Sequence, residues 1–96
     1  MSKSYGFIEI TGVVAAMDAL DIMCKTADVE LASWERKLGG RLVTIIVQGD
    51  VAAVTEAVEA GIRVAESMTG VVQHYVIPNP EPGTQKMLKI SALDKE

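Results

Sequence analysis

Few side chains in this sequence could carry out chemistry, because the chain has one cysteine and one histidine. Catalysis needs a nucleophile beside a base, a carboxylate pair or a metal cluster. Cys24 falls on an apolar helical stripe, so we expect a buried structural thiol. His74 has no second histidine or cysteine at metal-ligand spacing, so we expect a half-exposed histidine in a sheet. The sequence predicts no catalytic residue, no metal site and no cofactor.

A glycine pair with basic neighbours is the other candidate. Gly39 and Gly40 stand between Lys37 and Arg41. The segment lacks the Gly-x-x-x-x-Gly-Lys-Ser/Thr pattern of a phosphate loop, which must also precede a helix. The two cations are either edge charges that discourage sheet aggregation or, if copies of the turn met around a symmetry axis, a ring of concentrated positive charge. The residues alone leave both interpretations open.

The strands that would position these residues follow from alternation, β-branched runs and turn residues. Glycines mark a hairpin turn in the middle of the chain, and a proline-rich segment ends the last strand. The expected strands are Tyr5–Ile10, Glu30–Lys37, Leu42–Val47 and Val71–Ile77.

Two helices are expected between the strands, each with one apolar stripe. The first begins at Val13 with Thr11 as its cap, and its Asp21 and Lys25 are spaced for an exposed ion pair. The second opens at Asp50 and ends before Gly70, a residue that suits the position just past a helix. The stripes expected to be buried are Val13, Met17, Leu20, Cys24 and Ala27, and Val54, Val58, Gly61, Ala65 and Met68.

The resulting order is strand, helix, strand, strand, helix, strand. These elements bury their apolar faces most simply as an α+β, ferredoxin-like βαββαβ fold, in which a four-stranded antiparallel sheet carries both helices on one face. The other face of the sheet is left to solvent or to a partner. We expect a single domain over residues 1–96, in which residues 79–96 form a proline-rich turn and a tail that either docks as a short helix or frays.

Composition and charge exclude several classes of function. Hydrophobic residues make up 49% of the chain and charged residues 23%, as in a globular domain. The formal net charge of −4 provides no positive field for nucleic acid or anionic lipid. No apolar run reaches the roughly 20 residues that span a bilayer, and the N-terminus lacks the apolar run of a signal peptide. We expect a cytoplasmic protein that binds neither nucleic acid nor a membrane.

Several motifs, taken together and in order, resemble one known family. They are Gly6–Glu9, Cys24–Val29, Lys37–Gly40, Val43–Val51, Glu59–Gly61 and Val76–Pro80. Over about residues 5–80, the chain is similar to the single-domain, hexamer-forming shell proteins of bacterial microcompartments, which are built on the BMC domain.

The resemblance implies a structural shell tile and not an enzyme. It implies that six copies close into a flat ring, and that rings pack edge to edge with other shell proteins into a sheet that encloses enzymes. The positions that match the family's contacts between tiles are Lys25, Asp28 and Asn79. From the residues alone, Lys25 would instead be a solvated helix lysine paired to Asp21. Many family members have an arginine where this chain has Asn79.

The resemblance also implies a central pore for small polar metabolites, lined by the turn between the second and third strands. The matching residues are Lys37, Leu38, Gly39, Gly40 and Arg41. Gly40 stands where the family usually has a serine at the narrowest point, and Arg41 where it often has a second glycine. The segment before the turn is one residue longer than is usual in the family.

Two other functions on the same fold are alternatives. One is a ferredoxin-like regulatory module that binds a small ligand at a subunit interface and forms discrete dimers or trimers. The other is a small acyl-phosphate hydrolase, which is disfavoured because no loop joins an arginine to a phosphate cradle with a partnered asparagine. Ordered sheets or tubes of protein would distinguish a shell tile from both.

Overall fold

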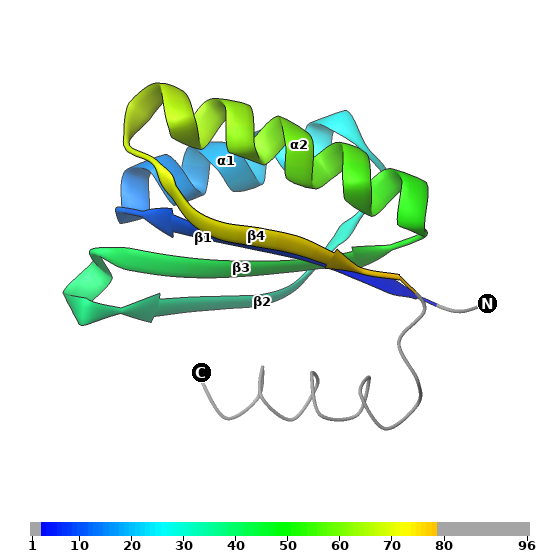
Figure 1. Ribbon diagram of the computed structural model, residues 1–96, viewed down its shortest axis with the longest axis horizontal. Coiled ribbons are helices and arrows are strands. Elements are labelled where there is room, and N and C mark those ends of the chain that lie inside the picture. Colours follow the sequence, from blue (N-terminus) through cyan, green and yellow to red (C-terminus); the bar gives the residue numbers. More distant parts are fainter. Residues whose placement is uncertain (1–2, 79–96) are drawn as a thin grey trace.

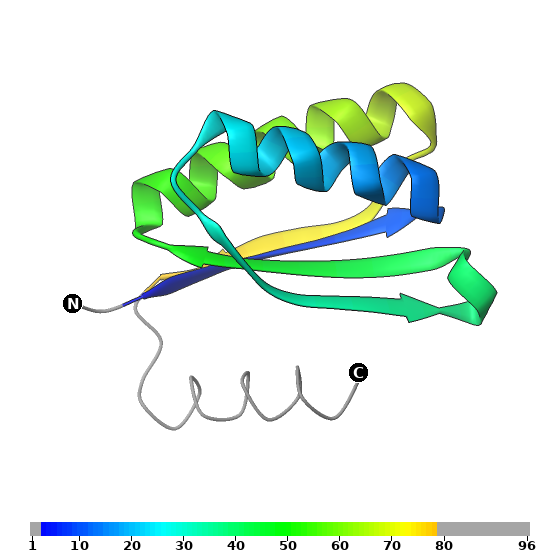
Figure 2. The same ribbon diagram turned by 180° about the vertical axis from the view of Figure 1, so that it is seen from behind.

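The computed structural model describes residues 3–78, which form one four-stranded sheet with two helices on one face (Figures 1 and 2). The elements are β1 (Ser4–Thr11), α1 (Val13–Thr26), β2 (Glu30–Lys37), the short 3-10 turn η1 (Leu38–Gly40), β3 (Leu42–Gly49), α2 (Val51–Met68) and β4 (Val71–Ile77). The strand order is β2-β3-β1-β4, and every neighbouring pair is antiparallel. The predicted ferredoxin-like fold is confirmed. The turn and tail expected over 79–96 lie outside the described residues.

The central strands of the sheet are β1 and β3. They pair over their full length, from Ser4 opposite Gly49 to Thr11 opposite Leu42. β2 is one edge of the sheet and has a register shift between Leu31 and Ser33. β4 forms the other edge, paired to β1. The long β1–β3 ladder therefore fixes which side chains face the helices and which face away.

The hydrophobic core lies between the sheet and the helices. The strands contribute branched side chains, whereas the helices contribute mainly alanines. The core includes Ile8, Ile10, Val43, Ile45 and Val47 from the sheet, and Ala15, Ala16, Ala19, Met23, Val54, Ala57, Val58 and Ala65 from the helices. Small side chains let α1 and α2 approach each other closely.

Two glycines make this close packing possible. A Cβ at Gly6 would lie 2.6 Å from a methyl group of Val58 and 2.7 Å from one of Val54. A Cβ at Gly61 would lie 2.7 Å from the sulfur of Met23. Gly6 therefore lets α2 lie directly on β1, and Gly61 lets α1 and α2 meet.

The stripe predicted to be buried on α1 is wrong in part. Met17 is 58% exposed and Cys24 is also exposed, whereas Ala19 and Met23 are fully buried. The buried stripe is displaced by one residue towards the N-terminus, and at Ala16 and Ala19 the close helix packing selects an alanine over the larger apolar residue that follows it. The prediction that Cys24 is a buried structural thiol is therefore corrected.

The second helix follows its prediction more closely. The predicted Val54, Val58, Gly61 and Ala65 are buried, whereas Met68 in the last turn is 45% exposed. Asp50 caps the helix by accepting a hydrogen bond from the amide of Ala53 at 2.9 Å. Gly70 follows the C-cap residue Thr69, as the sequence predicts. Within the described residues, neither helix is long and apolar enough to cross a membrane.

The predicted cap of α1 is wrong. Gly12, with φ of 91°, is the N-cap residue and provides no side-chain hydrogen bond. Thr11 is instead the last residue of β1, and its amide donates to the carbonyl of Gly70 at 3.1 Å. The strand continues one residue further than predicted, so the threonine is used in the sheet.

Candidate functional site

The β2–β3 turn contains the residues predicted to line a pore, and it projects from one end of the sheet (Figure 1). Leu38, Gly39 and Gly40 have φ values of 53°, 66° and 90°. Glycine adopts such angles readily, whereas leucine does so at a cost. Leu38 is also 66% exposed. A strained and exposed apolar residue in a turn is more typical of a functional site than of a feature that stabilises the fold.

Hydrogen bonds anchor the base of this turn to the start of α1. The amide of Gly12 donates to the carbonyl of Arg41 at 2.9 Å. The Arg41 guanidinium folds back on the turn, where its Nε donates to the carbonyl of Leu38 at 3.2 Å. The turn is therefore a fixed structure that holds Arg41 beside it.

The two glycines of the turn have different surroundings. A Cβ at Gly40 would lie 3.1 Å from Cγ2 of Val13, at the start of α1. A Cβ at Gly39 would have no atom within 4 Å. Gly40 is thus the packed side of the turn, and Gly39 is its free tip.

The two cations beside the turn are in different electrostatic environments. Nζ of Lys37 lies 3.3 Å from Oε1 of Glu35 and 3.7 Å from Oε2 of Glu9. Arg41 is exposed, and within residues 3–78 it has no ion pair. Both cations are predicted as site residues from the sequence, whereas the two glutamates are not.

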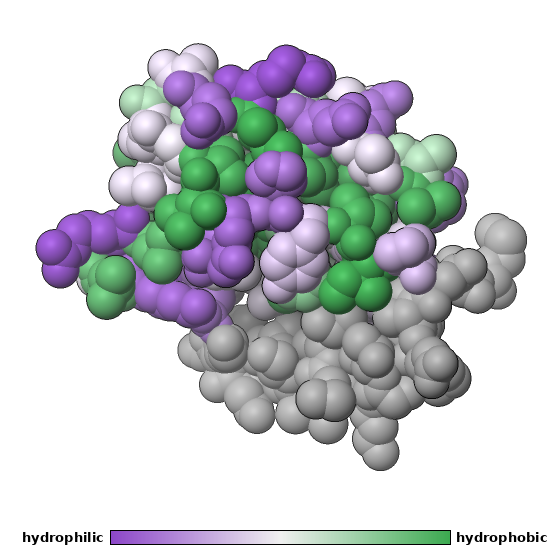
Figure 3. All heavy atoms as spheres, viewed as in Figure 1, coloured by the Kyte–Doolittle hydropathy of each residue, from purple (hydrophilic) through white to green (hydrophobic). Residues whose placement is uncertain are grey.

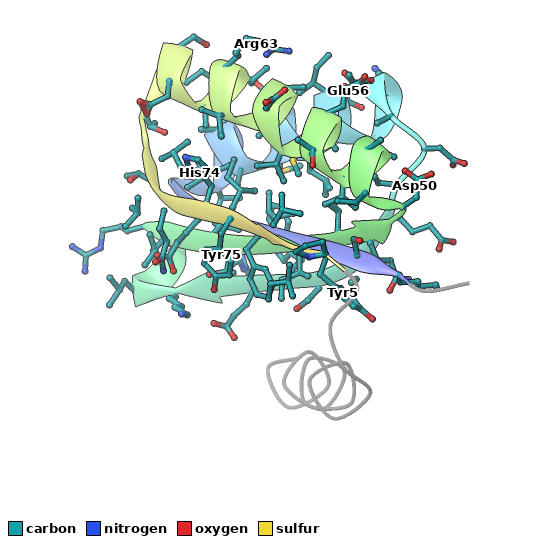
Figure 4. The ribbon with its side chains drawn as sticks, turned by 45° about the vertical axis from the view of Figure 1, so that its right-hand side comes forward. Tyr5, Asp50, Glu56, Arg63, His74 and Tyr75 are labelled. Atoms are coloured by element: carbon teal, nitrogen blue, oxygen red, sulfur yellow. The ribbon has the colours of Figure 1, made fainter. Side chains whose placement is uncertain are left out.

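Glu9 and Glu35 lie on the sheet face opposite the helices, which we call the open face. They line a pocket of about 180 Å³ on this face. Tyr5 and Tyr75 lie on the same face (Figure 4), and the rings of Phe7 and Tyr75 stack with their centroids 4.7 Å apart. The pocket is lined by Phe7, Glu9, Ser33, Glu35, Lys37, Thr44, Ile46 and Tyr75. It mixes charged and aromatic groups beside the turn.

The residues predicted to join tiles lie far from the turn. Lys25 is close to the C-terminal end of α1, at the opposite end of the molecule from the turn (Figures 1 and 2). Its Nζ lies 2.9 Å from Oδ2 of Asp21, and this hydrogen bond raises the pKa of Lys25. Asp28 is exposed in the connection to β2. Asn79 lies outside the described residues.

Within the part of the chain that the structure describes, Cys24 and His74 belong to no group of side chains that could hold a metal ion. Partial desolvation, and then the charge of Asp21, raise the pKa of the Cys24 thiol, which lowers its reactive thiolate fraction. His74 is exposed on β4 (Figure 4). Among residues 3–78, no three histidine, cysteine or carboxylate side chains are grouped to hold a metal ion.

Exposed apolar side chains occur on several elements of the surface, including α1, the turn and β4. Val14 is 68% exposed at the start of α1, and Leu38 in the turn is 66% exposed. On the other edge of the sheet, Val72 and Tyr75 of β4 are 58% and 46% exposed. Figure 3 shows apolar side chains reaching the surface among charged ones on the face formed by α2 and β4. Apolar side chains are therefore exposed both at the turn end of the molecule and on the edge strand β4.

This geometry defines a class: a small ferredoxin-like domain with an exposed basic turn at one end and an exposed lysine at the other. A model of the BMC domain family matches residues 4–80. The chain belongs to this family of bacterial microcompartment shell proteins, which confirms the resemblance seen in its motifs.

Comparisons with individual relatives support this family assignment. The chain is 42% identical over 86 residues to the bacterial microcompartment shell protein PduA of Citrobacter freundii, covering 90% of this chain and 91% of the relative. It is 38% identical over 88 residues to the shell protein EutM of Escherichia coli K12, covering 92% and 90%. A crystal structure of a microcompartments protein from Desulfitobacterium hafniense DCB superposes with a TM-score of 0.80 and 27% identity over 94% of this chain. The chain spans about half of that protein, because the match covers 48% of it.

Proposed function

We propose that this chain is a structural tile of a bacterial microcompartment shell in the cytoplasm, and that it has no catalytic activity of its own. Six copies close into a ring, and the rings pack with other shell proteins around the enclosed enzymes. The observation that carries the proposal is the separation of the basic turn from Lys25, at the two ends of a molecule of 35 × 27 × 18 Å. In a ring of flat protomers, one end lies at the axis and the other at the rim.

Exposed apolar side chains on separate elements support a ring of this kind. A cyclic interface is head to tail, so each protomer must offer two different surfaces to its two neighbours. Val14 and Leu38 are exposed at α1 and the turn, and Val72 and Tyr75 are exposed on β4. Burying them would also add apolar area to a 96-residue chain, which has little area to bury alone.

At the axis of the ring, the turn lines a pore for small polar metabolites. Gly39 and Gly40 leave backbone groups facing the channel, and Arg41 from each copy adds a positive charge. Such a ring of charge favours anions and neutral hydrogen-bonding molecules over cations. The open tip of the turn at Gly39 supports this assignment, because a Cβ there has no neighbour within 4 Å in one protomer.

At the rim, Lys25, Asp28 and Asn79 make the contact between rings. The lysine stem can lie along the surface of the next ring while its ammonium donates to backbone carbonyls. The exposure of Lys25 and Asp28 supports this role. The ion pair of Lys25 with Asp21 holds the ammonium near the end of α1, from which it can reach a neighbour.

Native mass spectrometry and electron microscopy of the purified protein test the proposal. We expect a particle of six chains of 10.3 kDa each, and ordered sheets or tubes at high concentration. A monomer at micromolar concentration would reject the ring. Discrete dimers or trimers without sheets would instead favour a regulatory module that binds a ligand at a subunit interface.

A further inference from the structure

Four polar side chains form a row across all four strands on the open face, and we call it the polar row. Glu35 of β2 lies opposite Thr44 of β3, Thr44 lies opposite Glu9 of β1, and Glu9 lies opposite Gln73 of β4. The Thr44 hydroxyl and the Gln73 amide each donate to Glu9 at 3.1 Å. The carboxylate of Glu9 is therefore held in place by hydrogen bonds from both neighbouring strands.

Lys37 lies over one end of this polar row. It follows Glu35 by two residues in β2, so the two side chains share the open face. The Lys37 ammonium lies within 4 Å of both carboxylates, at 3.3 Å from Glu35 and 3.7 Å from Glu9. Lys37 is also the last strand residue before the turn. Two carboxylates and one ammonium give this cluster a formal charge of −1.

Both carboxylates are shielded from water, which strengthens their effect on the lysine. Glu9 is 8% exposed and Glu35 is 9% exposed. Charges that are partly buried are screened by salt much less than charges in water. Removing one member of such a cluster leaves the others poorly compensated. The cluster therefore acts as a unit.

We propose that Glu9 and Glu35 hold Lys37 on the open face and outweigh its charge there, so that Arg41 alone provides the positive charge of the pore. This inference rests on the proposed position of the pore. At distances beyond the Debye length of about 8 Å, the Lys37 cluster carries no net positive charge. Arg41 has no carboxylate partner within residues 3–78, and its guanidinium is bonded to the turn itself. Glu9 and Glu35 are thus positioning residues that determine selectivity through Lys37.

The proposal predicts effects of different size for the two cations. Neutralising Arg41 removes up to six positive charges from the channel, whereas neutralising Lys37 changes each cluster on the open face from −1 to −2 and leaves the charges of the turn in place. Glu9→Gln keeps the size of the side chain but changes the charge of the cluster from −1 to neutral. It also weakens the hold on the ammonium. Lys37 then contributes to the field at the mouth of the pore.

The selectivity test compares entry of acetate and methylammonium into closed shells in which this chain is the main tile. We expect Arg41→Ser to lower the acetate-to-methylammonium ratio several-fold and Lys37→Met, whose charge lies on the open face, to lower it much less. Glu9→Gln should raise the ratio, and the double variant Glu9→Gln with Lys37→Met should return it to wild type. A Lys37→Met effect as large as that of Arg41→Ser would overturn the proposal.

A second measurement follows the lysine directly, on hexamers in solution. Acetic anhydride labelling, quantified by mass spectrometry with Lys25 as the internal reference, reports how accessible Lys37 is. Glu9→Gln and Glu35→Gln should each raise labelling of Lys37 relative to Lys25. Glu56→Gln, an exposed carboxylate on the outer side of α2 (Figure 4), is the matched control and should leave it unchanged.

The two measurements separate the two hypotheses. If Arg41→Ser leaves the selectivity unchanged, the pore is not at this turn and the proposed function fails at that point. Labelling of Lys37 still decides whether the two glutamates hold it. If labelling is the same in wild type, Glu9→Gln and Glu35→Gln, with circular dichroism showing all three folded, the glutamates do not position Lys37 and the inference is wrong.

Discussion

Serine substitutions at the two adjacent glycines of the turn should have very different effects on stability. Gly40 has φ of 90°, and a Cβ there would lie 3.1 Å from Cγ2 of Val13. Gly39 has φ of 66°, in the ordinary left-handed region, and a Cβ there meets nothing within 4 Å. Both changes place an L-amino acid in a left-handed conformation, but only Gly40→Ser also crowds a packed neighbour.

The free energies can be estimated from these two contributions. A left-handed conformation costs an L-residue roughly 1–2 kcal/mol, and overpacking costs typically about 1–3 kcal/mol. The β-branched Val13 is stiff at χ1 and relieves little of the crowding. We expect Gly39→Ser to lower the free energy of unfolding by about 1 kcal/mol and Gly40→Ser by about 3 kcal/mol. Since 1 kcal/mol shifts Tm by roughly 4–8 °C in a domain of this size, the two variants should differ by roughly 10 °C.

Thermal unfolding followed by circular dichroism measures this difference. The chains must be compared at equal concentration, because ring formation would add stability that depends on concentration. Equal losses of Tm in the two variants, or a smaller loss for Gly40→Ser, would refute the turn geometry on which the estimate rests. If the prediction holds, Gly39 is the better position for a larger residue that narrows the proposed pore without unfolding the protein.

Three further predictions concern the helices. Lys25→Ala should leave hexamers intact but impair sheets in electron micrographs, whereas the control Arg63→Ala, on the exposed side of α2, should leave both hexamers and sheets intact. Normal sheets, or loss of the hexamer, in Lys25→Ala would contradict the role of Lys25 at the rim. Met23→Ala should lower the free energy of unfolding, measured by urea denaturation, by about 2–5 kcal/mol, because Met23 is fully buried between the helices. A much smaller loss would mean that the neighbouring side chains move in to fill the cavity. Asp21→Asn should speed alkylation of Cys24 at mildly alkaline pH, because it removes a charge that raises the thiol pKa; an unchanged rate would show that desolvation alone controls this thiol.

Much of the fold could be predicted from sequence because its signals are local. The strands over Glu30–Lys37 and Val71–Ile77 have the predicted bounds, since turn residues mark their ends. The cap at Asp50 was also recognisable, because an aspartate before an apolar periodic run is a strong helix start. The buried face of α1 was not predictable in the same way. Its alanines are no more apolar than Met17, and the tight contact that selects them depends on α2.

The candidate site could be predicted only in part, for a related reason. The glycines of the turn are visible in the sequence, but the difference between Lys37 and Arg41 depends on which strands are neighbours. Glu9 reaches Lys37 only because β3 lies between β1 and β2 and brings Thr44 alongside it. One local signal pointed to Glu9. It lies on the same face of β1 as Tyr5, where a charged side chain needs a partner.

The alanine-rich contact between the helices has a mechanical consequence for a protein of a shell family. Ala15, Ala16 and Ala19 on α1 and Ala57 and Ala65 on α2 have no side-chain rotamers to rearrange under load. Densely packed protein interiors have low compressibility and transmit strain. Each protomer should therefore resist bending as a stiff plate. Curvature of a wall built from such plates would arise at the joints between them and not within the plates themselves.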